Sequence, residues 1–360
     1  MKPYILLTPG PLTTSPTVKE KMLVDYCTWD DDYNITIVQN IRNRLVALAT
    51  KQTADYTSVL LQGSGTYAVE AVITCSMSQK DKVLILTNGA YGDRMTAICQ
   101  YAGRNYEVLA FGETEPLSPS ELESSLQKMD DITHVAFVHC ETTSGILNPL
   151  EDLCRIAKKH NKTLIVDAMS SFGGIPFDTG SLGIDYMISS ANKCIEGVPG
   201  FAFIIARCSE LERCEGNSKS LSLDIYAQWK TMENGNGKWR FTSPTHTVRA
   251  FKQALDELDA EGGIESRYKR YKENQQILAQ GMKMSGYNIL IPEDIQSPII
   301  SSFEYPDKDF SFKDFYTKLK KQGFVIYPGK ISGADTFRIG SIGRIYPTDM
   351  KKLTEVISSL

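Results

Sequence analysis

The sequence has few histidines, no paired cysteines and no long apolar run. Only 4 of its 360 residues are histidines, and they show no metal-ligand spacing. The 8 cysteines are scattered without a Cys-x-x-Cys pair, which is typical of reduced thiols in the cytoplasm. No stretch approaches the length of a transmembrane helix, and the apolar run at the N-terminus is too short for the core of a signal peptide. We therefore expect a cytoplasmic protein with neither a metal site nor a membrane partner.

An excess of basic residues is also missing. The chain has 39 Lys and Arg against 43 Asp and Glu, a net charge of −4, and it contains no basic block. Nucleic acid and anionic membranes are therefore not expected partners, which leaves small molecules. A hydrophobic share of 42% and a charged share of 23% are ordinary for a globular protein. The length suffices for one large domain and a smaller one.

Short apolar runs alternate with segments of helical period, which predicts an α/β fold with a mostly parallel central sheet flanked by helices. The expected strands are 56–61, 83–87, 107–111, 134–139, 163–168, 186–189 and 201–206, and the helices between them are 67–77, 94–102, 121–128 and 150–160. Further on, helices are expected at 221–232, 247–260, 264–284, 311–321 and 348–359, with short strands at 287–291, 299–304, 325–327 and 336–339. We predict a large domain over residues 1–265 and a smaller α+β domain over residues 266–360.

Lys193 is the most informative residue of the chain. It follows the expected strand 186–189 and precedes a stretch rich in glycine and proline, so it should lie at the mouth of a sheet. Lysine amines form Schiff bases with carbonyl groups and with pyridoxal phosphate. Most lysines are solvated surface groups, however, so Lys193 indicates chemistry only if other strand ends supply a cofactor site.

A small-residue turn between a strand and a helix contains Ser64, Gly65 and Thr66. Glycine lets the backbone approach a phosphate, and the start of the helix offers free N–H groups and partial positive charge. The turn lacks the Gly-Lys-[Ser/Thr] ending of a Walker loop. Taken alone, it is as consistent with a plain capped turn as with a phosphate site.

Three other strand ends carry side chains that suit a cofactor. Asp167 follows four apolar residues, and it could pair with a pyridinium nitrogen, ligate a metal or cap a helix. Tyr91 could stack on a flat ring or pack in the core, and the hydroxyl of Thr142 could bind a phenolic oxygen or stabilise a turn. The carboxyl ends of parallel strands meet at one edge, where open α/β sheets bind ligands. A phosphate cradle, an acid, an aromatic ring and a lysine together indicate a pyridoxal-phosphate site.

These motifs resemble those of the class V aminotransferases, a group of fold-type I pyridoxal-phosphate enzymes, and the resemblance covers nearly the whole chain. It implies that Lys193 holds pyridoxal 5′-phosphate and carries a proton, that Asp167 pairs with the ring nitrogen, and that Arg338 binds the substrate carboxylate. It also implies a homodimer with shared active sites and an N-terminal segment that borders them. The implied cofactor-binding residues are Ser64, Gly65, Thr66, Tyr91, Thr142, Asp167, Asn192 and Lys193, with Trp239 and Thr242 contributed by the neighbouring subunit.

Within this group the chain is most similar to members that act on 2-aminoethylphosphonate and pyruvate in phosphonate degradation. The stretches that carry the similarity are 6–14, 42–45, 241–246 and 324–330. The resemblance implies ping-pong transfer of the amino group, giving phosphonoacetaldehyde and L-alanine, with Arg338 binding phosphonate in one half-reaction and carboxylate in the other. Arg42, Arg240 and Lys330 are further candidates for phosphonate recognition.

Three alternatives remain at this point. One is an aminotransferase of the alanine–glyoxylate or serine–pyruvate type, which shares the cofactor residues. Another is a member related to cysteine desulfurases, disfavoured because no cysteine lies near Arg338 in the sequence. The third is a non-enzymatic protein that binds nucleotide phosphates through residues 63–66, which leaves Lys193 and Asp167 unexplained.

Overall fold

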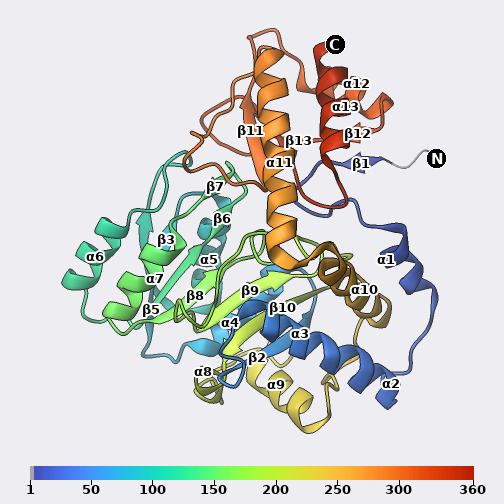
Figure 1. Ribbon diagram of the computed structural model, residues 1–360. Coiled ribbons are helices and arrows are strands. Elements are labelled where there is room, and N and C mark those ends of the chain that lie inside the picture. Colours follow the sequence, from blue (N-terminus) through green and yellow to red (C-terminus); the bar gives the residue numbers. More distant parts are fainter. Residues whose placement is uncertain (1–3) are drawn as a thin grey trace.

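The computed structural model of the chain describes residues 4–360, and its centre is a seven-stranded sheet (Figure 1). Across the sheet the strands are β2 (Tyr56–Gln62), β10 (Phe201–Arg207), β9 (Tyr186–Ser190), β8 (Thr163–Asp167), β5 (His134–Val138), β3 (Lys82–Thr87) and β4 (Asn105–Ala110). Strand β10 is antiparallel to both of its neighbours, and all other adjacent pairs are parallel. The predicted mostly parallel sheet is thus confirmed.

Helices cover both faces of the sheet, which explains why its strands read as continuous apolar runs rather than as alternating patterns. Along β3, Leu84 and Leu86 belong to one apolar core, and Val83 and Ile85 belong to the other. The first core is closed by α3 (Asn40–Ala49), α6 (Pro119–Lys128), α7 (Leu150–Lys159) and α10 (Thr245–Glu261). The second is closed by α4 (Gly65–Ser76), α5 (Ala90–Ala102), α8 (Cys208–Glu212) and α9 (Ile225–Asn234).

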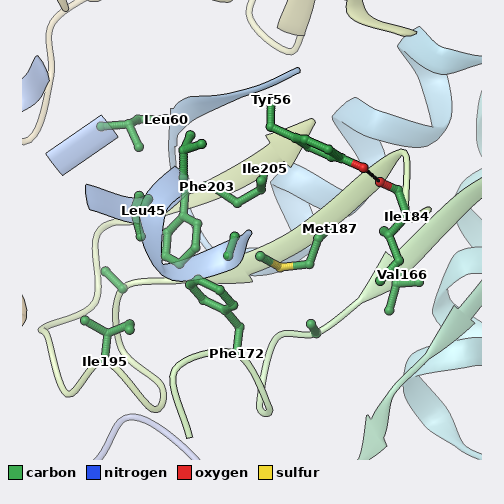
Figure 2. Packing of buried hydrophobic residues seen from close by; sticks show 14 of the residues in the cluster. Leu45, Tyr56, Leu60, Val166, Phe172, Ile184, Met187, Ile195, Phe203 and Ile205 are labelled. Atoms are coloured by element: carbon green, nitrogen blue, oxygen red, sulfur yellow. Dashed lines mark hydrogen bonds between the residues drawn. The ribbon is translucent and has the colours of Figure 1, made fainter. Parts of the chain in front are cut away.

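The larger of these two cores contains aromatic and aliphatic side chains from several strands (Figure 2). Phe203 meets Phe172 edge-on, with ring centroids 5.7 Å apart. Tyr56 is buried among these residues, and its hydroxyl donates to the carbonyl oxygen of Ile184 at 2.8 Å. The partner satisfies the only polar group of this side chain, so the ring can be buried without an unpaired hydroxyl.

The C-terminal part forms a separate layered unit around its own apolar core. Its three-stranded sheet has the order β11 (Ile300–Glu304), β14 (Thr336–Gly340) and β13 (Tyr327–Pro328), packed with α11 (Gly263–Met284), α12 (Phe312–Lys321) and α13 (Pro347–Ser358). The N-terminal strand β1 (Ile5–Leu6) pairs in parallel with β12 (Phe324–Val325), so the chain start lies on this unit. Helix α11 runs through the predicted boundary at 265/266, and this division stays a prediction.

The structure differs from the expected elements mainly where segments are short. Residues before β2, for which we predicted no elements, contain α1 (Pro16–Glu20), a 3-10 turn (Lys21–Leu23), α2 (Asp31–Tyr33), a π-helical segment (Asn34–Gln39) and α3. The hairpin of β6 (Cys140–Glu141) and β7 (Ile146–Leu147) was not predicted either, because two-residue strands show no periodicity. The strand expected at 287–291 is reduced to one bridge between Ile289 and Phe303.

Candidate active site

Most of the predicted cofactor residues line one cavity of about 210 Å³ at the carboxyl edge of the central sheet. The strands β2, β3, β5, β8 and β9 run in the same direction, so the loops that follow them converge there. Two larger hollows, of about 560 and 770 Å³, lie beside Arg42 and along α11 and include none of these residues. The lining residues of the smaller cavity are Ser64, Gly65, Thr66, Val69, Tyr91, Arg94, Asp167, Met169, Ser190, Asn192 and Lys193.

The Lys193 side chain is half-buried at this cavity and is held by the N-terminal segment. Its Nζ donates to the carbonyl oxygen of Pro9 at 2.8 Å. Gly10 follows with φ of +123°, and a Cβ there would lie 2.8 Å from Cδ of Lys193. Burial lowers the pKa of Lys193, although the neighbouring Tyr91 and Asp167 groups oppose the shift. A lowered pKa increases the fraction of neutral amine, which is the nucleophilic form.

Asp167 ends β8 inside the cavity and lies too far from any described cation to form an ion pair. Its Oδ1 accepts a hydrogen bond from the backbone N–H of Met169 at 2.8 Å. Burial raises the pKa of this carboxyl to about 6, with a further increase from Glu141 and opposing effects from Lys193 and Arg94. A buried carboxyl that lacks a cationic partner suits a ligand with a protonated ring nitrogen.

The start of α4 forms a cradle for an anion. The Ser64 side chain does not cap the helix, and the first turn carries no acidic residue. A Cβ on Gly65 would lie 2.2 Å from Cε of Met169, so only glycine fits without displacing that side chain. Arg94 adds positive charge beside this helix start. Its Nη1 donates to Oγ1 of Thr66 at 3.1 Å. Helix N–H groups beside a guanidinium fit a phosphate group.

Tyr91 lies at the start of α5 with cations around its ring. The guanidinium of Arg94 is 4.9 Å from the ring centroid and the Nζ of Lys330 is 4.3 Å away. Burial alone would raise the pKa of Tyr91, but the charge of Lys193, a hydrogen bond with Thr142 and the charge of Lys330 outweigh it, so the pKa lies below its ordinary value. The ring faces the same cavity as Lys193 and Asp167, as stacking on a cofactor requires.

Glu141 connects the loops that carry Tyr91 and Thr142. Its carboxylate is fully buried and accepts from the backbone N–H of Tyr91 at 3.3 Å and from that of Thr143 at 3.0 Å. Burial raises its pKa, and these hydrogen bonds oppose the shift. The two bonds hold the stacking residue and the predicted hydroxyl donor in one arrangement.

Arg338 reaches the same region from β14 of the C-terminal unit. Its Nε donates to the carbonyl oxygen of Pro328 at 3.0 Å and its Nη1 donates to that of Thr142 at 2.7 Å. Burial lowers its pKa, opposed by the nearby Tyr91 and Tyr327. Within residues 4–360 the guanidinium forms no ion pair, and its Nη2 donates to no residue. This end of the guanidinium therefore remains available for an anionic ligand.

Trp239 and Thr242 do not line the cavity. They lie in a separate hollow of about 340 Å³ together with Arg240 and Phe241. The Trp239 ring packs edge-on against Phe201, with centroids 6.2 Å apart, and is almost fully buried within its own subunit. Their predicted contribution to the phosphate site therefore requires a second copy of the chain, and it stays a prediction.

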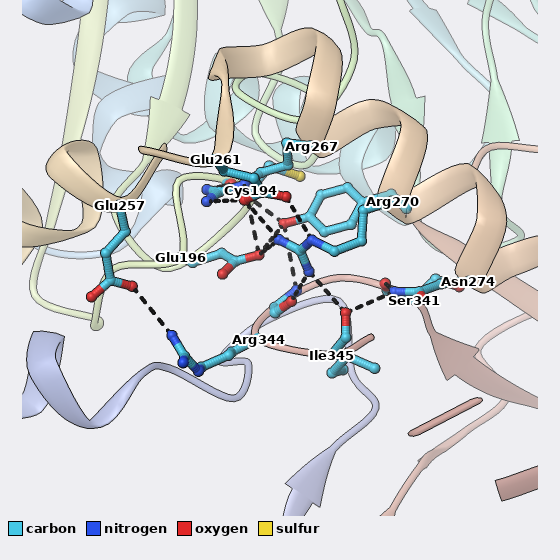
Figure 3. Close-up of polar contacts among 12 residues, drawn as sticks. Cys194, Glu196, Glu257, Glu261, Arg267, Arg270, Asn274, Ser341, Arg344 and Ile345 are labelled. Carbon is cyan, nitrogen blue, oxygen red and sulfur yellow. Dashed lines mark hydrogen bonds and ion pairs between the residues drawn. The ribbon is translucent and has the colours of Figure 1, made fainter. Parts of the chain in front are cut away.

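A buried ion-pair network supports the Lys193 loop from behind (Figure 3). Glu196, which has a left-handed φ of +65°, donates its backbone N–H to the carbonyl oxygen of Lys193 at 2.7 Å. The Glu196 carboxylate accepts from Nη2 of Arg270 at 2.8 Å, and Arg270 also donates to the carbonyl oxygens of Gly343 and Ile345. Arg270 thus joins the lysine loop to the segment that follows the strand of Arg338.

Replacing Arg270 by methionine should lower the free energy of unfolding by about 3–5 kcal/mol, because the Glu196 carboxylate would remain buried without its nearest cation. Urea denaturation measures the change. Arg344 is the control, because it is 44% exposed and lies 3.8 Å from Glu257; its replacement by methionine should cost less than about 1 kcal/mol. Equal losses for the two variants would contradict a special role of the buried pair.

Four residues that line the cavity were not predicted from the sequence: Val69, Arg94, Met169 and Ser190. Glu141, which holds the Tyr91 loop from outside the lining, was not predicted either. Arg94 could have been found, because it lies three residues after Tyr91 on a helix and so shares its face. Glu141 directly precedes Thr142, but only the structure shows that it accepts hydrogen bonds from two loops. No sequence signal indicates that Met169 packs against Gly65.

No group of three or more His, Cys, Asp or Glu side chains in residues 4–360 could hold a metal ion. None of the helices in the same residues combines the length and the apolar character needed to cross a bilayer.

Comparison with known proteins gives a consistent result. The family model for class V aminotransferases matches residues 32–344. A Bacteroides fragilis protein named 2-aminoethylphosphonate–pyruvate transaminase is 64% identical over 99% of both chains. A protein of the same name from Vibrio cholerae is 59% identical over 97% of this chain and 95% of its own. An alanine–glyoxylate aminotransferase from Nostoc sp. superposes with a TM-score of 0.92 at 22% identity, covering 100% of this chain and 95% of its own, a likeness of fold alone.

Proposed function

Because the chain belongs to the class V aminotransferase family, we propose that it transfers the amino group of 2-aminoethylphosphonate to pyruvate with pyridoxal 5′-phosphate as cofactor. The products are phosphonoacetaldehyde and L-alanine. The observation that carries the proposal is near-full-length identity of 59–64% to relatives named for this reaction. The cavity at the sheet edge supplies the chemistry that such a reaction needs.

The residues of the cavity fit the cofactor. The N–H groups at the start of α4, with Ser64 and Thr66, would hold its phosphate, and Asp167 would pair with its protonated ring nitrogen. Tyr91 would lie against the ring, and Lys193 would hold it covalently. When bound, pyridoxal phosphate supplies an electron-poor ring that stabilises negative charge on the substrate carbon next to the amino group.

Lys193 has two successive roles in this proposal. With pyridoxal phosphate bound, the Lys193 amine would hold it until a substrate amine takes its place. The freed Nζ would then be the group that carries the proton removed from the substrate carbon. Burial lowers the pKa of Lys193, which favours the neutral form of the amine that can accept this proton.

Arg338 orients the substrate by its anionic end. The carbonyl oxygens of Pro328 and Thr142 fix the guanidinium plane at 3.0 and 2.7 Å. A fixed guanidinium edge binds carboxylate or phosphonate through two parallel charge-assisted hydrogen bonds. The same residue can therefore serve both half-reactions, placing the reacting carbon of each substrate near Nζ of Lys193.

Single-turnover half-reactions test the proposed substrates. The cofactor-loaded enzyme is mixed with 2-aminoethylphosphonate, L-alanine or L-serine, and the absorbance of the lysine-bound cofactor is followed. We expect rapid loss of that absorbance with 2-aminoethylphosphonate and with L-alanine, the product of the second half-reaction. Rapid conversion by the two amino acids without conversion by 2-aminoethylphosphonate would refute the phosphonate assignment and favour an alanine–glyoxylate or serine–pyruvate type enzyme.

We further propose that the protein is a cytoplasmic homodimer with shared active sites. The separation of Thr242 from the cavity of its own chain supports sharing, because a second copy would be needed to bring it there. The cysteines at all 8 positions are free thiols, in keeping with a reducing compartment.

Mixing two inactive variants tests the shared site. In a dimer of Lys193→Ala and Thr242→Ala subunits, one site lacks both residues and the other keeps both. Statistical reassembly of equal amounts should therefore restore about one quarter of wild-type activity. Thr242 is used rather than Trp239, because Trp239 also packs in the core of its own subunit. Activity that stays at the sum of the two parent variants would mean that each site is built from one chain.

A further inference from the structure

Lys330 carries a positive charge beside Tyr91, one of the residues that line the cavity. It lies between β13 and β14, two residues past Pro328, whose carbonyl oxygen orients Arg338. Its Nζ is 4.3 Å from the centroid of the Tyr91 ring. It forms no ion pair with any residue from 4 to 360, although a partly buried ammonium is normally paired or solvated. Its charge is therefore available to an anionic ligand.

The loop that carries Lys330 is attached to the large domain. Ser332 donates to Oε2 of Glu113 through its backbone N–H at 2.8 Å and through its hydroxyl at 2.6 Å. Glu113 lies in the loop that follows β4 of the central sheet. This contact attaches the segment two residues past Lys330 to the large domain.

The other two basic candidates, Arg42 and Arg240, form their hydrogen bonds outside the cavity of their own chain. The Arg42 guanidinium is buried and donates to the carbonyl oxygen of Ser58, to Thr57 and to Glu233, in a hollow apart from Lys193. Arg240 donates to the carbonyl oxygen of Leu221 and lies with Thr242 outside the cavity. Within one chain Lys330 is therefore the candidate that lies near the surroundings of Arg338, because its Nζ is 4.3 Å from the Tyr91 ring centroid and Tyr91 also acts on the pKa of Arg338.

The geometry of Arg338 leaves a phosphonate incompletely bound. Nε and one N–H of Nη1 are used by Pro328 and Thr142, so the Nη1–Nη2 edge keeps three N–H groups for a ligand. That edge satisfies both oxygens of a carboxylate. A phosphonate has a third oxygen and, near neutral pH, a second negative charge, which lie outside the two-point contact with a planar guanidinium edge.

We propose that Lys330 binds the third oxygen of the substrate phosphonate and thereby makes the site select 2-aminoethylphosphonate over carboxylate-bearing amines. The inference rests on the proposed function and assigns its substrate discrimination to one residue. Pyruvate and L-alanine depend on Arg338 alone for their carboxylates. Lys330 is thus a specificity residue, and its replacement changes the ratio of the two half-reactions rather than both rates together.

The test compares single-turnover kcat/KM for 2-aminoethylphosphonate and for L-alanine in wild type, Lys330→Met and Lys330→Arg. Loss of one charged hydrogen bond should lower the phosphonate value of Lys330→Met roughly 10- to 100-fold and the alanine value by about threefold or less. Lys330→Arg keeps the charge and should retain most of the discrimination. Lys351→Met, at an exposed position on α13, is the control for loss of a lysine and should leave the ratio unchanged.

Each outcome separates the specificity role from the proposed function. Equal losses with both substrates, or no loss with 2-aminoethylphosphonate, would overturn the role of Lys330 while the aminotransferase assignment stands. A wild-type enzyme that converts L-alanine but not 2-aminoethylphosphonate would overturn the proposed substrate, and the inference with it. The alanine half-reaction also reports whether Lys330→Met is folded, so a loss of phosphonate activity cannot be mistaken for misfolding.

Discussion

Replacement of Lys193 by alanine is expected to lower turnover by roughly 10⁴-fold or more, because one residue both anchors the cofactor and carries the proton. The variant should still bind cofactor and substrate, since the start of α4, Tyr91 and Asp167 remain in place. It should stop before proton transfer, because no other described amine lines the cavity. Absorbance spectra with stopped-flow mixing measure binding and turnover separately.

Two comparisons distinguish this chemical role from a structural one. Lys193→Arg keeps the positive charge and a donor for the carbonyl oxygen of Pro9, yet it cannot form the covalent bond. It should therefore be as inactive as Lys193→Ala but better folded. Added methylamine should restore part of the activity of Lys193→Ala, since a free amine can carry the proton. An inactive variant that neither binds cofactor nor responds to amine would point to a purely structural lysine.

The central sheet could be predicted because burial on both faces produces apolar runs that are visible without alignment. The direction of β10 could not, because an antiparallel strand with two covered faces has the same apolar run as a parallel one. The short helices before β2 were missed because they stand in a loop-rich segment with a π-helical turn, where no single period is sustained. The direction of a buried strand and the formation of irregular helices depend on tertiary packing, which the local sequence does not show.

The candidate site was likewise predictable from the sequence only in part. Ser64, Asp167 and Lys193 follow parallel strands, and topology alone brings them to one edge. Arg338 comes from the C-terminal unit, so its position depends on how two parts of the chain pack, and the family resemblance was needed to identify it. The support of Lys193 by Glu196 and Arg270 has no sequence signal, because contacts 74 residues apart follow from packing and not from spacing.

Replacement of Asp167 by asparagine should have opposite effects on catalysis and on the stability of the cofactor-free protein. Turnover should fall roughly 10²-fold or more, because a neutral amide cannot keep the ring nitrogen protonated. Asparagine retains the acceptor for the N–H of Met169, so the β8 turn should keep its structure. What it removes is a buried carboxylate for which no described residue provides an ion-pair partner.

The sign of the stability change follows from the pKa of Asp167. Folding raises that pKa from 3.8 to about 6, so the protonated acid is favoured in the folded state. The stability that it contributes is complete below pH 3.8 and is lost as the pH rises through 6. At pH 8 the variant should therefore be more stable than wild type by up to about 3 kcal/mol, and at pH 5 by about half as much. Urea unfolding of the cofactor-free proteins at both pH values measures this.

Asp185 provides the matched control for Asp167, because it is equally buried but lies within 3.2 Å of Arg207 and 2.8 Å of Lys158. Asp185→Asn leaves two cations without their carboxylate, so it should destabilise the protein at pH 8. If both variants lost stability, Asp167 would be an ordinary structural acid with a partner that the apo protein already supplies. If Asp167→Asn gained stability and lost turnover, the unpaired charge would be retained for catalysis, since the partner that stabilises it is the ring nitrogen of the bound cofactor.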